Sequence, residues 1–195
     1  MESAEFLALL EQTGAVQAGH FLLSSGRHSP QYIQCARLLQ HPDLAERTCG
    51  ALAHRFLPDH PQVVIAPAMG GIIVAHEVAR ALGVRALFAE RVDGQFVIRR
   101  SLTIAPGERV LIVEDVVTTG GSTREIADLV EEDGGHIIGM GALVDRTGGA
   151  ARVPWRFEAL IAMTVPTYEP AACPQCALGL PAVKPGSRAV PEPAR

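Results

Sequence analysis

The chain has 195 residues, of which 48% are hydrophobic and 19% are charged. These values are those of an ordinary globular domain with one buried core, and they exclude the fibrous and intrinsically disordered classes. The formal net charge of -4 leaves no broad basic field that would hold a polyanion such as DNA. Any anion that the protein binds must therefore be held locally, by backbone amides and a few arginines.

The N-terminal segment, MESAEFLALLEQTG, carries acids and a short apolar face. It lacks the basic start, the long apolar run and the small-residue cleavage site of a secretory signal. No stretch of the sequence approaches the roughly 20 apolar residues that span a bilayer. We therefore expect a cytoplasmic protein, in which the four cysteines are reduced thiols rather than a disulfide framework.

Two helices are predicted in the first third of the chain. Phe6, Leu9 and Leu10 recur at helical spacing, and Gly14 follows as a stop. Pro42 suits the first turn of a second helix, because its fixed φ is that of a helix. The second helix would bury four apolar side chains, those of Leu44, Ala51, Leu52 and Phe56.

Further along, apolar strands alternate with helices. Strands are predicted at 63–66, 86–88, 109–113, 137–144 and 159–163, and helices at 72–82 and 122–132. Near-continuous apolar strands separated by helices are typical of the α/β class, in which a mostly parallel sheet is covered by helices on both faces.

Two segments differ from this pattern. Residues 90–100 (ERVDGQFVIRR) place Asp93 and Gly94 between strand-like flanks, which is a hairpin signal. Because this segment is polar and basic, we expect a protruding β-hairpin loop that leaves the sheet. After Tyr168 the chain is rich in Pro and Gly, and we expect residues 186–195 to be a disordered tail.

The most informative segment is 110–123, VLIVEDVVTTGGST. A buried strand ends in two acids, passes through a Thr-Thr-Gly-Gly turn and enters a helix at Ser122, which with Glu125 has the form of a capping box. Gly120 and Gly121 let the backbone approach a ligand, and the amides at the start of a helix favour a phosphate. In an open α/β sheet, ligands bind at this end of the strands.

The two acids, Glu114 and Asp115, need a separate reason. Carboxylates are poor neighbours for a phosphate, but they accept hydrogen bonds from ribose hydroxyls and offset positive charge on a sugar ring. A phosphate site next to paired acids therefore indicates a 5-phosphoribosyl group. The segment is not a P-loop, because no Lys follows the glycines. The alternative is a plain strand-turn-helix with Gly for the turn and Ser for the cap.

Residues 110–123 resemble the phosphoribosyl pyrophosphate (PRPP) signature of the type I phosphoribosyltransferase family. Three more segments resemble the members of that family that act on orotate: FLLSSGRHSPQYIQCARLLQ (21–40), IAPAMGGIIVAHEVA (65–79) and LVDRTGG (143–149). The resemblance implies one domain over residues 1–195. It would have a core at about 45–165 and a small hood from about 1–40 and 165–185. It also implies Mg²⁺ carried by PRPP, homodimers with shared active sites, and conversion of orotate and PRPP into orotidine 5′-monophosphate and pyrophosphate.

The resemblance also implies site residues. PRPP would be bound by Glu114, Asp115, Val116, Val117, Thr118, Thr119, Gly120, Gly121 and Ser122 together with Arg91. The pyrophosphate loop would be Ala68, Met69, Gly70 and Gly71, and orotate would contact Thr118, Arg146 and Tyr32. The catalytic residues would be Glu114, Asp115 and Arg91. No protein side chain is expected to bind the metal directly.

The chain departs from many relatives in its mobile loop. Here that stretch is AERVDGQFVIRR (89–100), which contains no Lys and no His. The catalytic loop lysine of those relatives therefore has no counterpart, and Arg91 is the candidate for the donated cation, with Arg99 and Arg100 as reserves. Relatives also carry lysines where this chain has Ser24 and Gly70.

Cys173 and Cys176 form a CxxC pair. A zinc knuckle needs four ligands, and the sequence shows no second close pair. Reduced thiols in a C-terminal turn are the prediction, and a structural metal is the alternative. The seven histidines show no HxxxH or HExxH spacing, so we expect them at the surface or in packing positions.

Two other functions stay open at this point. A purine-type phosphoribosyltransferase would keep the segment from Glu114 to Ser122 but should lack SSGRHSPQY. A PRPP-binding regulator of RNA or DNA is a different class, and the negative net charge disfavours it. We therefore expect no partner among nucleic acids or membranes.

Overall fold

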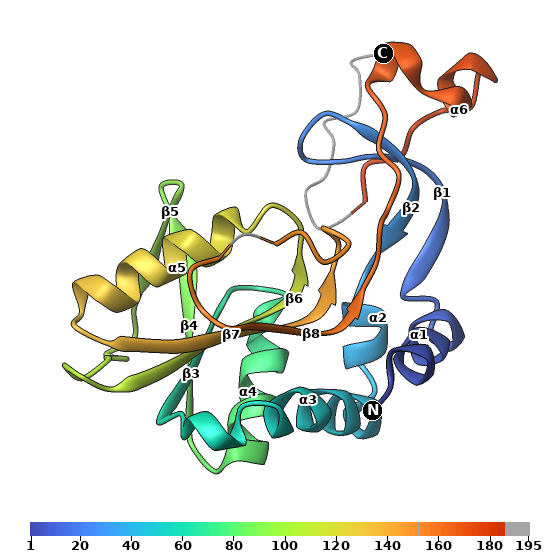
Figure 1. Ribbon diagram of the computed structural model, residues 1–195. Coiled ribbons are helices and arrows are strands. Elements are labelled where there is room, and N and C mark those ends of the chain that lie inside the picture. Colours follow the sequence, from blue (N-terminus) through green and yellow to red (C-terminus); the bar gives the residue numbers. More distant parts are fainter. Residues whose placement is uncertain (152, 186–195) are drawn as a thin grey trace.

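The computed structural model describes residues 1–151 and 153–185. Within them the six-stranded main sheet has the order β5-β4-β3-β6-β7-β8, and β1 and β2 pair separately (Figure 1). The strands are β1 (Val16–Leu22), β2 (His28–Ile33), β3 (Val63–Pro67), β4 (Arg85–Val92), β5 (Gln95–Ile98), β6 (Arg109–Val117), β7 (His136–Asp145) and β8 (Phe157–Ala162). The helices are α1 (Ser3–Gln12), α2 (Ala36–Leu39), α3 (Pro42–His54), α4 (Gly71–Leu82), α5 (Gly121–Glu132) and α6 (Pro174–Ala177), with 3-10 turns η1 (Leu57–Asp59) and η2 (Pro170–Ala172).

The main sheet is mostly parallel, as predicted for an α/β protein. Strand β3 pairs in parallel with β4 and β6, and β7 lies parallel to β6 and β8. Successive side chains of a strand point to opposite faces. Accordingly, Val64 and Leu111 belong to one cluster with α1, α3 and α4, whereas Ile65 and Ile112 belong to another with α5. Helices therefore cover both faces of the sheet, which confirms the prediction (Figure 1).

The predicted hairpin forms between β4 and β5. Asp93 and Gly94 have φ values of 51° and 88°, and two left-handed residues in succession suit the tight turn of a right-twisted hairpin. The expected departure from the sheet is wrong, however. Strand β5 stays paired with β4 from Ala89↔Ile98 to Val92↔Gln95 and forms the antiparallel edge of the main sheet. Phe96 is buried beside α5, and this burial anchors the hairpin.

A second, smaller unit stands off the main sheet (Figure 1). It consists of the β1–β2 hairpin and the C-terminal segment, residues 16–33 and 166–185, and we call it the hood. The C-terminal segment is joined to the hairpin by backbone bridges between Phe21 and Val183 and between His28 and Tyr168. Helix α1 packs Phe6 into the main core cluster instead.

Some predictions are left untested by this structure. The division of the chain into a core and a hood stays a prediction, and the expected tail at 186–195 lies outside the described residues. Among the described helices, none is long and apolar enough to cross a bilayer. The cytoplasmic location likewise stays a prediction.

Candidate functional site

The two acids of the predicted sugar site lie within the last third of β6. The strand continues to Val117, beyond the predicted end at Val113, because β7 pairs alongside it, with Glu114 opposite Ala142. Both acids are half-buried. Glu114 Oε2 accepts a hydrogen bond of 3.0 Å from the hydroxyl of Thr123 in the first turn of α5. The strand thus presents its acids directly in front of the start of that helix.

Burial makes the charged form of both acids costly. It raises the pKa of Glu114 to about 7, with a further rise from the nearby Asp115 and an opposing effect of the Thr123 hydroxyl. Burial also raises the pKa of Asp115, against the hydrogen bond from the Val116 backbone. Neither acid forms an ion pair with any described residue. Two adjacent acids that lack a cationic partner are suited to accept hydrogen bonds from ligand hydroxyls or to face a cation.

The turn after β6 leads into α5 without a side-chain cap. Gly120 is the N-cap with φ of 74°, and no side chain caps the helix, so the predicted Ser122–Glu125 capping box is wrong. Glu125 instead pairs with Arg91, whose guanidinium nitrogens lie 2.8 and 2.9 Å from its carboxylate oxygens. The first amides of a helix have no intrahelical acceptor. At the start of α5 they also donate no capping bond, because the Ser122 hydroxyl accepts no hydrogen bond from them. They remain available to an anion.

The predicted pyrophosphate loop, residues 68–71, lies against the same acids. A Cβ atom on Gly70 would be 2.8 Å from both carboxylate oxygens of Asp115, which is closer than such contacts allow. A Cβ on Gly71 would be 2.7 Å from that of Ala66, so glycine lets α4 begin directly on β3. Glycines at 70 and 71 therefore place the start of α4 beside Asp115, and no side chain caps the first amides of this helix.

Arg146 follows the end of β7 on the other side of the acids. Its backbone N–H donates to the Val117 carbonyl at 2.8 Å, which fixes the loop to β6. Its side-chain Nε is buried and has no hydrogen-bond partner, and burial lowers the pKa of the guanidinium, with the negative form of Tyr32 opposing that shift. A buried guanidinium nitrogen without a partner is a costly feature that an acceptor on a ligand would satisfy.

Tyr32 of β2 brings the hood into the site. Burial raises the pKa of its phenol, with a further rise from the charge of Asp115 and an opposing effect of Arg146. The phenol therefore lies within the electrostatic reach of both groups. Its ring also packs on that of Phe21, with centroids 5.7 Å apart. An aromatic ring of the hood thus lies near both Asp115 and Arg146.

Asp145 is a positioning residue that the sequence analysis did not single out. It is buried, and its carboxylate accepts hydrogen bonds from the backbone N–H groups of Thr147 and Gly149 at 2.7 and 3.0 Å. These bonds shape the turn that carries Arg146. The available signal was an acid directly before the arginine in LVDRTGG, since Asp side chains commonly bond the backbone two residues on.

The described arginines of the β4–β5 segment form no hydrogen bond or ion pair with the acid pair. Besides its pair with Glu125, Arg91 lies over the Phe96 ring at 4.0 Å from the ring centroid. Arg100 pairs with Glu90 at 3.2 Å. Arg99 is exposed and has no ion pair with any residue that the structure describes. The catalytic role predicted for Arg91 stays a prediction, and so do the binding roles of the other site residues, including the exposed Thr118 and Thr119.

Comparisons with known proteins agree with this geometry. The family profile of the phosphoribosyl transferase domain matches residues 35–164. The orotate phosphoribosyltransferase of Pelotomaculum thermopropionicum is 56% identical over 97% of this chain and 100% of its own length. The crystal structure of orotate phosphoribosyltransferase from Aeropyrum pernix superposes with a TM-score of 0.67 at 27% identity, covering 80% of this chain and 92% of that one.

The fold extends beyond the orotate enzymes. Adenine phosphoribosyltransferase from Thermoanaerobacter pseudethanolicus has a TM-score of 0.68 at 19% identity, over 80% of this chain and 99% of that one, and this likeness concerns the fold alone. The match of residues 35–164 includes β3, α4, β6 with its acid pair, and α5. On these grounds the chain belongs to the phosphoribosyl transferase domain family.

Proposed function

We propose that this protein transfers the 5-phosphoribosyl group of PRPP to orotate, giving orotidine 5′-monophosphate and pyrophosphate in pyrimidine biosynthesis. The observation that carries the proposal is the position of two acids without cationic partners between the helix starts of α4 and α5. The curated relatives at 56% and 52% identity, both orotate phosphoribosyltransferases, support orotate as the base.

The sugar phosphate would bind along the β6–α5 turn. In this arrangement the amides at the start of α5 and the hydroxyls of Thr118, Thr119 and Ser122 hold the 5′-phosphate. Glu114 and Asp115 accept hydrogen bonds from the ribose hydroxyls. The amides of residues 68–71 face the diphosphate group at C1, because Gly70 brings that loop against Asp115.

Orotate would bind between the end of β7 and the hood. Its carboxylate is the acceptor that the unpartnered Nε of Arg146 lacks, and a guanidinium holds a carboxylate in a fixed plane. The ring of Tyr32 covers the base, and Thr118 contacts its edge. Orotate N1 then lies near C1 of the sugar.

In the proposed reaction the bond from C1 to the diphosphate oxygen breaks and a bond from C1 to N1 of orotate forms, while the proton on N1 passes to the departing diphosphate or to water. The sugar ring passes through an oxocarbenium-like state, whose positive charge is offset by the nearby carboxylates of Glu114 and Asp115. Backbone amides at the start of α4 stabilise the charge on the departing diphosphate. Most of the catalysis is thus positioning and charge stabilisation, with no covalent enzyme intermediate.

Mg²⁺ is part of the proposal. When it is bound with PRPP, the ion neutralises charge on the diphosphate leaving group. The residues present fit such a complex, because Glu114 and Asp115 are acidic oxygen donors without a protein cation beside them. They would face the ion through the ribose hydroxyls and water.

The proposed active unit is a homodimer in which a loop cation reaches the partner's site. Arg91 lies in β4 of the edge hairpin and Arg99 directly follows β5. Arg99 is exposed. Mass measurement by light scattering should give a dimer. An Asp115→Asn chain mixed with an Arg91→Ala,Arg99→Ala chain should regain activity if sites are shared, and a failure of this rescue would contradict sharing.

A single assay tests the function. Purified protein with PRPP and Mg²⁺ should consume orotate, followed by its absorbance, and should release pyrophosphate. Turnover of adenine, hypoxanthine or guanine in place of orotate would indicate a purine-type enzyme. Binding of PRPP by calorimetry without turnover of any base would indicate a regulator, and either result would overturn the proposal.

A further inference from the structure

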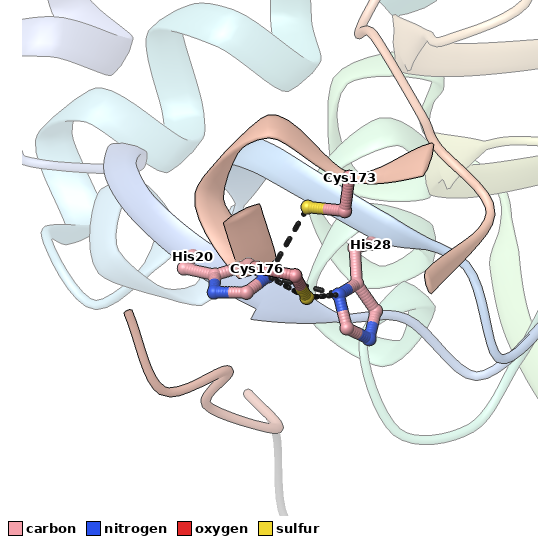
Figure 2. Close-up of side chains that lie close together, drawn as sticks. All are labelled: His20, His28, Cys173 and Cys176. Atoms are coloured by element: carbon pink, nitrogen blue, oxygen red, sulfur yellow. Dashed lines mark hydrogen bonds between the residues drawn. The ribbon is translucent and has the colours of Figure 1, made fainter. Parts of the chain in front are cut away.

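Four side chains that can bind a metal converge in the hood (Figure 2). They are His20 of β1, His28 of β2, and Cys173 and Cys176 around the start of α6, and we call them the hood cluster. One ligand atom from each lies within 4.8 Å of all the others. The two pairs are separated by about 150 positions in sequence, so their meeting depends on the docking of the C-terminal segment on the hairpin.

The His20 ring is oriented as a metal ligand requires. His20 Nδ1 lies 2.9 Å from the Leu180 carbonyl. Because a carbonyl oxygen only accepts, this nitrogen carries the proton, and Nε2 therefore faces the cluster with its lone pair. A ring nitrogen that donates to a backbone carbonyl while the other faces a metal is the usual arrangement around ligating histidines.

Hydrogen bonds alone do not satisfy the cluster. His20 Nε2 is approached by His28 Nδ1 at 2.9 Å, by Cys173 Sγ at 3.4 Å and by Cys176 Sγ at 3.7 Å. It has a single lone pair, so it can accept from one of the three. One cation at the centre would use the lone pair of every member at once.

The distances are close to those of a tetrahedral zinc site, and small side-chain movements would complete its geometry. With Zn–N of about 2.0 Å and Zn–S of about 2.3 Å, ligand atoms around a tetrahedral ion are roughly 3.3 to 3.8 Å apart. Two observed N–S distances, 3.4 and 3.7 Å, lie in this range. The third N–S distance, 3.2 Å, and the N–N distance, 2.9 Å, are shorter, so the two rings would move apart slightly around an ion. Two thiolates and two neutral imidazoles around Zn²⁺ also give a site without net charge, which is suited to burial. His20, His28 and Cys173 are indeed at most 8% exposed.

The hood has little apolar packing to hold it. Within the hood, the hydrophobic clusters of the described residues include only Ile33, with Val16 packed against the same cluster, and both lie at the strand ends next to the core. Leu178, Leu180 and Val183 of the C-terminal segment are 75%, 48% and 59% exposed. Small units with so little core are commonly stabilised by a structural metal.

We propose that the hood cluster binds one Zn²⁺ ion, which fastens the C-terminal segment to the β1–β2 hairpin. Binding releases the two thiol protons to solvent and changes no oxidation state. All four protein ligands fill the coordination shell, as in structural rather than catalytic zinc sites. The family profile covers residues 35–164 and includes none of the four, so the profile match says nothing about this site.

The first test is metal analysis of the full-length protein, purified without chelator or added metal. One zinc ion per chain is expected. Exchange for Co²⁺ should give the visible absorption of a tetrahedral ion together with a thiolate-to-cobalt charge-transfer band. Zinc-free protein with free thiols or a Cys173–Cys176 disulfide would overturn the proposal, and so would octahedral cobalt without thiolate bands. Stoichiometric iron, copper or nickel would overturn the assignment to zinc.

Variants locate the site. Cys176→Ala removes an exposed ligand and His28→Gln a buried one, and each should lose the zinc. Cys49→Ala, a buried thiol of α3, and His136→Gln, an exposed histidine, are the matched controls and should keep it. Zinc retained at full stoichiometry by Cys176→Ala and by His28→Gln would contradict the assignment. If a variant fails to fold, the cobalt spectrum of the unmodified chain still decides.

Discussion

In the core, Val110, Leu111, Ile112 and Val113 of β6 are fully buried, alternately against the helices on the two faces of the sheet. In the hood, β1 and β2 instead meet the C-terminal segment through backbone hydrogen bonds, such as those between His28 and Tyr168. The core is thus held by apolar burial, which needs only a pattern of side chains. The hood is held by a few hydrogen bonds, which form only when donors and acceptors from distant parts of the chain are brought to the right positions.

The proposed active site lies across this boundary. The acids of β6, the glycines before α4 and Arg146 belong to the core, whereas Tyr32 comes from the hood. Changes in the core should therefore affect stability, turnover and PRPP binding. Changes in the hood should act mainly on the ring that covers the base.

The largest expected effect is on stability. Ile112→Ala should lower the free energy of unfolding by about 2 to 5 kcal/mol, because it leaves a cavity in a fully buried strand. Leu178→Ala in the hood should change it by less than about 0.5 kcal/mol, since that side chain is 75% exposed. Denaturant unfolding of both variants measures the contrast. Equal losses would show that the hood also depends on apolar packing.

The sequence is informative about the core for the same reason. Apolar runs and helical spacing predict β3, α4, β6 and α5, because a buried sheet requires continuous apolar strands whatever lies around it. The acids of β6 could be assigned to a sugar site because they directly follow such a run. Even there the strand is longer than predicted, since β7 continues alongside it.

The predictions that were wrong or missing depend on distant partners. Ser122 and Glu125 have the local pattern of a capping box, but Glu125 pairs with Arg91, 34 positions away. His20 and His28 have no spacing that indicates a metal site, and they meet the CxxC pair only because the C-terminal segment folds back onto the hairpin. Local sequence patterns carry no information about contacts between residues that are far apart in the chain.

The next effect concerns the acids of the core. Asp115→Asn should lower kcat/KM for PRPP about 10²- to 10³-fold, because an amide adds a donor where ribose hydroxyls need an acceptor and removes charge facing the oxocarbenium-like state. Steady-state kinetics with orotate in excess measures the loss. Asp128→Asn, an exposed acid of α5, is the control and should keep full activity. Full turnover by Asp115→Asn would refute the role given to this acid.

A smaller effect is expected at the base site. Arg146→Ala should raise the KM for orotate about 10- to 100-fold, since a hydrogen bond to a charged group contributes roughly 1.5–3 kcal/mol. The KM for PRPP should change little. Arg156→Ala, which removes an exposed arginine near β8, is the matched control. An unchanged KM for orotate in Arg146→Ala would place the carboxylate elsewhere.

The last effect, which is small near neutral pH, is a pH dependence that originates in Glu114. Its pKa is raised to about 7 in the folded chain, from an ordinary value near 4.5, so the fold favours the protonated form. The contribution of this group to stability is therefore full below about pH 4.5 and is lost as the pH rises through about 7. Hydroxyl binding needs the ionised form. As the pH rises through about 7, activity should therefore increase while the contribution of Glu114 to the free energy of unfolding decreases.

Below about pH 7, kcat/KM for PRPP should fall up to about tenfold per pH unit. The phosphate of PRPP itself titrates near pH 6. The wild-type profile of kcat/KM against pH must therefore be divided by the profile of Glu114→Gln. That variant uses the same substrate but lacks the acid. The ratio should show a single ionisation near pH 7. A flat ratio would mean that Glu114 stays ionised throughout or does not contact the sugar. The profile of Arg146→Ala should keep the ionisation, because that arginine acts on the base and not on the ribose hydroxyls.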